Sequence, residues 1–70
     1  MMPLTLADTG ATYTILKVGG KPEVRAHLND RGFVAGGDVQ VITDMMGNLI
    51  VNVKETRVAI SKEMAAKIMV

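Results

Sequence analysis

The sequence has no cysteine, which excludes disulfide bonds and any metal site built on thiolates. Aromatic residues are almost as scarce, since Tyr13 and Phe33 are the only two. The core must therefore consist of aliphatic and methionine side chains. A surface for single-stranded nucleic acid needs exposed aromatic rings beside a basic groove. We therefore expect no nucleic-acid partner.

An excess of one charge and long apolar runs are also missing. The formal net charge is +1, and acidic and basic residues are interleaved, whereas a nucleic-acid or anionic-membrane surface needs a concentrated basic patch. No apolar run approaches the roughly 20 residues that span a bilayer. Residues 1–6 lack the basic region of a signal peptide. We therefore expect a cytoplasmic protein without direct membrane insertion.

Residue types used in catalysis are few. His27 is the only histidine, there is no cysteine, and no serine is an evident partner for His27. The glycines fall at predicted turns, and none belongs to a phosphate-binding loop of the GxxxxGK[ST] kind. We therefore predict that the protein is not an enzyme and requires no cofactor.

Apolar residues make up 49% of the 70 residues, enough for one small domain over residues 1–70. β-Branched residues gather in short segments between glycine-containing turns, a pattern typical of strands. Pro22 favours a helix start, and Ser61 is a good N-cap. Closure into a small barrel would remove exposed strand edges. The predicted elements are strands over residues 11–18, 38–45, 49–54, 57–60 and 68–70, a helix over 21–31 and a helical turn over 62–66.

Two segments between these elements are expected to pack on the core. Gly32 follows the predicted helix as its C′ residue, so Phe33 should fold back onto the helix as the apolar contact of a C-cap. Residues 1–7 are mostly apolar and should pack against the domain.

The valine pattern predicts how the strands after residue 37 pair. We expect a two-residue loop at residues 55–56 and a three-residue loop at residues 46–48. This register buries Met45 and Leu49. The predicted pairs are Val53–Val58 and Val51–Ile60 across the second loop, and Val41–Val53, Thr43–Val51 and Met45–Leu49 across the first.

Three segments, taken in order, resemble a known family. They are LNDRGF at residues 28–33, GGDVQVI at residues 36–42 and RVAISKEMAAKIMV at residues 57–70. Their order, spacing and fit to the chain length are similar to the ferrous iron transport protein A (FeoA) family over nearly the whole chain. Two features depart from the family pattern. Ile60-Ser61 stands where many members have Leu-Arg, and the hairpin around Gly47 is shorter than the common form.

The resemblance implies a mainly β, SH3-like barrel of about five strands, with a helix between the first two and a helical turn before the last. It also implies an accessory protein of bacterial ferrous iron uptake, peripheral to the inner membrane through its partner. That partner is a membrane ferrous iron transporter of the FeoB type, whose cytosolic GTPase domain would bind the nucleotide. The same domain type occurs in metal-dependent repressors, but no helix-turn-helix segment is present here.

Direct iron(II) binding is the alternative hypothesis. Glu23, His27 and Asp30 recur at helical spacing and could offer one nitrogen and two carboxylates to a weakly bound divalent ion. The same pattern also fits a solvated helix face on which the two carboxylates pair with neighbouring cations.

Two groups of residues are candidate partner contacts. Met46 and Ile50 should face outward, and methionine is frequent at binding surfaces, although both could instead pack under the N-terminal segment. Lys54 and Arg57 should flank the second turn and point outward together. Like charges placed opposite each other are destabilising, so an acidic partner could offset them, as could Glu55 or solvent.

Overall fold

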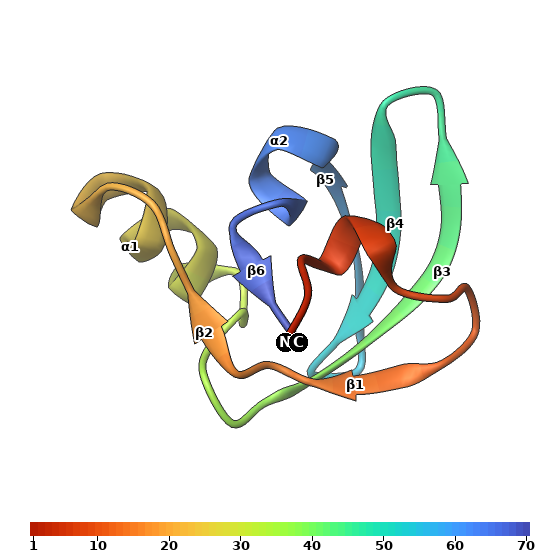
Figure 1. The fold of residues 1–70 in the computed structure, drawn as a ribbon, viewed down its shortest axis with the longest axis horizontal. Helices are drawn as coiled ribbons and strands as arrows, with labels where there is room; N and C mark the ends of the chain where they lie inside the picture. The colour runs from red at the N-terminus through yellow and green to blue at the C-terminus, as the bar shows by residue number, and fades with distance from the viewer.

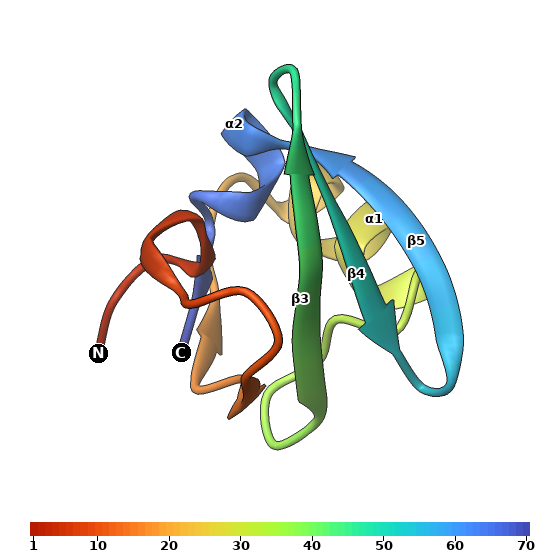
Figure 2. The same cartoon turned by 90° about the vertical axis from the view of Figure 1, so that its right-hand side faces the viewer.

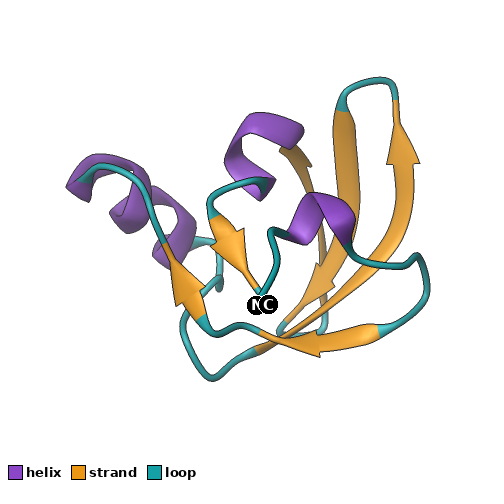
Figure 3. Cartoon of the chain, in the orientation of Figure 1, coloured by secondary structure: helices purple, strands orange, loops and turns teal.

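The computed structural model describes residues 1–70, and its strands form two antiparallel sheets (Figures 1 and 3). No helix is long and apolar enough to cross a membrane. In chain order the elements are η1 (Leu4–Leu6), β1 (Thr12–Thr14), β2 (Lys17–Val18), α1 (Pro22–Asp30), β3 (Asp38–Met45), β4 (Asn48–Val53), β5 (Thr56–Ser61), α2 (Lys62–Ala65) and β6 (Ile68–Met69).

The larger sheet has the strand order β1-β3-β4-β5, and the smaller sheet pairs β2 with β6. The expected first strand is divided into β1 and β2, because the backbone changes partners between them. The Ile15 N–H donates to the Gly37 carbonyl, and the Leu16 N–H donates to the Met69 carbonyl, each at 2.8 Å. The fold is mainly β and SH3-like, as predicted. The hydrogen-bonded barrel does not close, however, since β1 and β5 remain the two edges of the larger sheet.

The β4–β5 turn differs from the prediction. Its two central residues are Lys54 and Glu55, with φ of 49° and 62°, so Val53 pairs with Thr56. Positive φ at both central positions is the geometry of a type I′ hairpin turn. The predicted loop would have placed the β-branched Thr56 at such a position, which is sterically costly. The predicted register was wrong by two residues, and the even shift kept the same residues facing the core.

The β3–β4 register was also wrong. A two-residue turn, Met46-Gly47, replaces the predicted three-residue loop, and a bulge between Val41 and Thr43 shifts the pairing. Val41 therefore pairs with Val51, whereas beyond the bulge Asp44 pairs with Leu49. Met45 is 55% exposed and not buried as predicted, because the bulge turns it away from the core face and the shorter turn leaves it at the exposed turn end of the hairpin.

The core is aliphatic apart from one ring. The Phe33 N–H donates to the Leu28 carbonyl and the Gly32 N–H to the Asn29 carbonyl, each at 3.0 Å, which is the Schellman pattern at the end of α1. Phe33 is fully buried, as predicted. The buried cluster comprises Leu4, Ile15, Leu28, Phe33, Val39, Val41, Leu49, Val51, Val53, Ile60, Ala65, Ile68 and Val70.

The two ends of the chain pair with each other. Met2 and Val70 exchange two backbone hydrogen bonds of 2.8 Å, and Pro3 forms an isolated antiparallel β-bridge with Met69. Leu4 is thereby fully buried, which confirms the predicted packing of the N-terminal segment. At α2 the Ser61 hydroxyl accepts a hydrogen bond from the Met64 N–H at 3.2 Å, so Ser61 is the predicted N-cap.

Candidate functional site

The four predicted contact residues do not form one patch. Met46 and Lys54 lie in the turns at opposite ends of β4, whose six residues extend about 20 Å. Ile50 is half-buried and pairs with Ala59, while Arg57 pairs with Asn52. Lys54 therefore does not face Arg57 across the hairpin, which corrects the prediction. The reason is that Lys54 belongs to the turn and not to β4.

The first exposed surface is the methionine tip, which we define as Met45 and Met46. Met46 is 100% exposed and Met45 is 55% exposed. The turn projects beyond the rest of the molecule at the end of the β3–β4 hairpin (Figure 1). Methionine is flexible and polarisable, so such a tip can adapt to an apolar partner surface.

The methionine tip is attached to the N-terminus of α2. The Lys62 N–H donates to the Gly47 carbonyl at 3.0 Å, and its ammonium lies 3.0 Å from the Asp44 carboxylate. The ion pair is about half-exposed, so its contribution to stability is at most about 1 kcal/mol. These two contacts restrict the tip without burying its methionines.

A second surface lies between β5 and the C-terminal half of α1 (Figure 2). Two hollows of about 150 and 380 Å³ share Arg31. We call them together the β5 groove, lined by Leu28, Arg31, Val53, Val58, Ile60 and Met64. No sequence pattern indicated this groove, because its walls come from four separate elements, α1, β4, β5 and α2.

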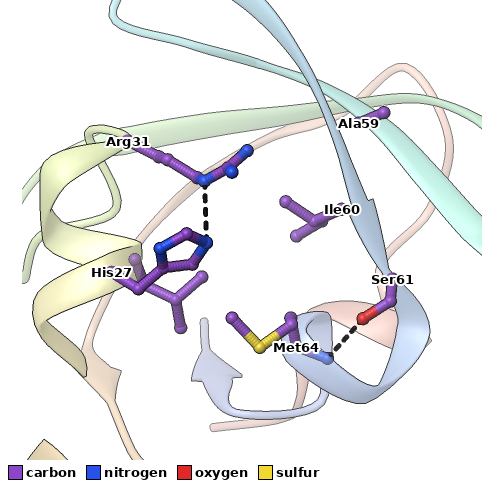
Figure 4. A pocket seen from close by; sticks show the side chains of 7 residues that line it. His27, Arg31, Ala59, Ile60, Ser61 and Met64 are labelled. Carbon is purple, nitrogen blue, oxygen red and sulfur yellow. Dashed lines mark hydrogen bonds between the residues drawn. The ribbon is translucent and has the colours of Figure 1, made fainter. Parts of the chain in front are cut away.

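The charges around the β5 groove are mostly unpaired. The only ion pair of the chain joins Lys62 to Asp44, so Arg31, Lys54 and Arg57 have no carboxylate within 4.0 Å. The Arg31 Nε–H instead donates to His27 Nε2 at 3.2 Å, on the wall of the smaller hollow (Figure 4). Arg31 and Lys54 are therefore available to a ligand in the groove, and Arg57 is exposed on the other face of β5.

The predicted metal ligands all lie on α1 but do not converge. Glu23 and Asp30 are seven residues apart, which separates them by about 10 Å along a helix axis. No three His, Cys, Asp or Glu side chains are grouped so as to hold a metal ion. His27 Nε2 is also occupied by the Arg31 guanidinium N–H. These residues do not fit a preformed three-ligand site, and weak iron(II) binding at α1 stays a prediction.

Solved structures of the same shape are known. The iron uptake regulatory protein FeoA, solved in a monoclinic space group, has a TM-score of 0.88 at 29% identity over 97% of this chain and 90% of its own. The FeoA protein of Chlorobium tepidum has a TM-score of 0.82 at 25% identity over 97% of this chain and 67% of its own.

A zinc complex of Stenotrophomonas maltophilia FeoA is a more distant match, with a TM-score of 0.72 at 20% identity over 99% of this chain and 88% of its own. That protein is described as an SH3 domain protein and a candidate activating factor of bacterial ferrous iron transport. No curated protein sequence is significantly similar to this chain.

The family model of the FeoA domain matches residues 2–70, which is nearly the entire chain. This match agrees with the resemblance carried by residues 28–33, 36–42 and 57–70. FeoA-domain proteins form an accessory family associated with ferrous iron transport. The chain therefore belongs to the FeoA domain family.

Proposed function

We propose that this protein docks on the cytosolic part of the membrane ferrous iron transporter of the FeoB type and modulates its activity. The observation that carries the proposal is the methionine tip, two exposed apolar side chains on an anchored hairpin in a FeoA-domain protein. The description of the S. maltophilia protein as a candidate activating factor of ferrous iron transport supports a transporter partner.

Modulation requires that the domain bind two conformations of the transporter with different affinity. A tenfold shift of that equilibrium needs about 1.4 kcal/mol of differential binding. Burying one methionine side chain supplies about 1.5–3 kcal/mol. A contact that engages the methionine tip in only one conformation would therefore suffice.

The docking face must be wider than the methionine tip. A standard interface buries about 800 Å² on each partner, which is roughly a fifth of the 4229 Å² accessible surface of this chain. Residues beside the tip, including the half-buried Ile50 on β4, would complete the contact.

The test is an NMR titration of the ¹⁵N-labelled protein with the transporter's cytosolic GTPase domain from the same organism. Amides around Met45 and Met46 should shift as one contiguous set. The double variant Met45→Ser/Met46→Ser should bind about ten- to a hundredfold more weakly. Leu6→Ser is the matched control, because it removes another exposed apolar side chain, 68% exposed, from η1. Absence of any shift at saturating GTPase domain would refute docking on that domain.

Divalent metal binding is the second candidate function, and the zinc complex of the S. maltophilia relative is the observation that favours it. Because the donors on α1 do not converge, ligands from a partner would be needed, and Arg31 would have to move away from His27 Nε2. An anaerobic iron(II) titration of wild type and His27→Ala tests this. Affinity that falls at acidic pH and is lost in His27→Ala would support it, and equal affinity in both proteins would end it.

A further inference from the structure

We infer that the free edge of β5 accepts an extended acidic segment of the partner as an additional strand. This inference rests on the docking proposed above and names the kind of segment recognised. It depends on three features of the structure, which are the unpaired backbone of β5, the β5 groove beside it and the cations around it.

Only every second residue of β5 forms backbone hydrogen bonds with β4. In a two-residue hairpin closed by Val53 and Thr56, hydrogen-bonded pairs alternate with non-hydrogen-bonded ones. Val58 and Ile60 therefore bond to β4, whereas the N–H and C=O groups of Arg57 and Ala59 point away from it. No hydrogen bond outside the β4–β5 pairing uses those groups. An exposed row of this kind is a template for strand addition.

The β5 groove gives the added strand a place to lie. Its hollows follow β5 from Thr56 to Ser61, and α1 forms the opposite wall. Val58 and Ile60 point toward the groove, and Met64 lines it at one end. Side chains alternate along a strand. Every second residue of the incoming segment would therefore enter the groove, and these residues should be apolar.

The charges select the remaining residues of the segment. Arg57 lies on the solvent face of β5, so the residue beside it on an added strand would be stabilised if it were acidic. Arg31 and Lys54 line the larger hollow, so they lie on the side that the apolar residues enter, and without ion pairs they add to the positive charge near the Thr56 end of β5. Asp30 lines the larger hollow and Glu55 follows Lys54 in the turn, so three cations outnumber two carboxylates around this edge. An acidic segment fits this edge and a basic one does not.

A second copy of this chain fits the edge less well. Pairing two β5 edges would add a second Arg57 and no carboxylate to this edge, because β5 contains no acidic residue. Like charges on neighbouring strands are destabilising. The occupant is therefore a segment of a different protein.

The test uses an acetylated, amidated hexapeptide of alternating glutamate and valine as the probe, with the intact ¹⁵N-labelled protein. Binding should shift the amides of residues 56–61 and slow the hydrogen exchange of the Arg57 and Ala59 amides. Ala59→Pro removes one outward N–H but no bond to β4, and proline is tolerated on edge strands. It should weaken binding at least about tenfold, while the matched control Ala59→Ser should retain it.

A peptide N-methylated at alternate residues should also fail to bind, which tests backbone pairing even if Ala59→Pro does not fold. Equal binding of a lysine-for-glutamate peptide would overturn the acidic preference. Shifts confined to the methionine tip, or concentration-dependent shifts of β5 without peptide, would overturn the inference as a whole.

Two results distinguish a failure of the strand addition from a failure of transporter docking. If the GTPase domain binds wild type and Ala59→Pro equally well, transporter docking stands and the strand addition is wrong. If the peptide binds β5 and the GTPase domain binds nowhere, the strand-accepting edge stands and docking on that domain is wrong.

Discussion

The turn at Lys54-Glu55 gives a sharp prediction about stability. Both residues have positive φ, 49° and 62°, although neither is glycine or asparagine. An L-residue in this region costs about 1–2 kcal/mol, whereas asparagine and glycine adopt it readily. Replacing both residues should therefore stabilise the turn, but glycine loses more conformational entropy on folding, which offsets about 0.5–1 kcal/mol of that stabilisation. The double variant Lys54→Asn/Glu55→Gly should therefore be about 1 kcal/mol more stable than wild type.

Urea unfolding followed by circular dichroism measures this change. For a slope near 1 kcal/mol/M, about that of a small domain, the midpoint should rise by about 1 M. The thermal midpoint should rise by roughly 4–8 °C.

The matched control is Lys54→Ala/Glu55→Ala, which removes the same two charges and keeps two L-residues with Cβ atoms in the turn. It should gain little or nothing. Equal stabilisation of both double variants would show that charge and not backbone conformation limits the turn. An Asn-Gly variant no more stable than wild type would refute the type I′ assignment.

Three further predictions concern single side chains. Phe33→Ala removes a fully buried ring and should cost about 3–5 kcal/mol, which a small domain cannot spare, so its amide spectrum should lose much of its dispersion. Ser61→Ala removes the N-cap of α2 and should cost about 1 kcal/mol in urea unfolding, whereas Ser61→Asp should retain most of the stability. Lys62→Ala should cost less than about 1 kcal/mol but speed the hydrogen exchange of the Met45 amide, which pairs with Asn48 next to the turn. An unchanged exchange rate would show that Asp44 does not hold the methionine tip.

Local chemistry was sufficient to predict α1 and α2 to within one residue at each end, although it did not predict η1 or the division of the first strand. Pro22 and Gly32 bracket α1 because each residue suits one helix end. Phe33 was assigned to the core from its position after Gly32, and Ser61 was assigned as a cap from its side chain. Each of these predictions depends on interactions within a few residues, which a sequence displays directly.

The hairpin registers were not predictable in the same way. Lys54 and Met46 adopt positive φ without being typical turn residues, so the residue types led us to place the two turns at neighbouring positions. The bulge between Val41 and Thr43 has no marker such as glycine, and it changes which face Met45 occupies. The β5 groove could not be predicted from the sequence, because the elements that form its walls come together only in the folded chain.

The pairing of Met2 with Val70 means that both ends of the chain leave the surface at one point. In two perpendicular views this point lies away from the methionine tip (Figures 1 and 2). A domain with adjacent ends can be spliced into a loop of another protein, or circularly permuted, without being pulled apart. A fusion at either end would thus emerge from the same place and leave the methionine tip uncovered.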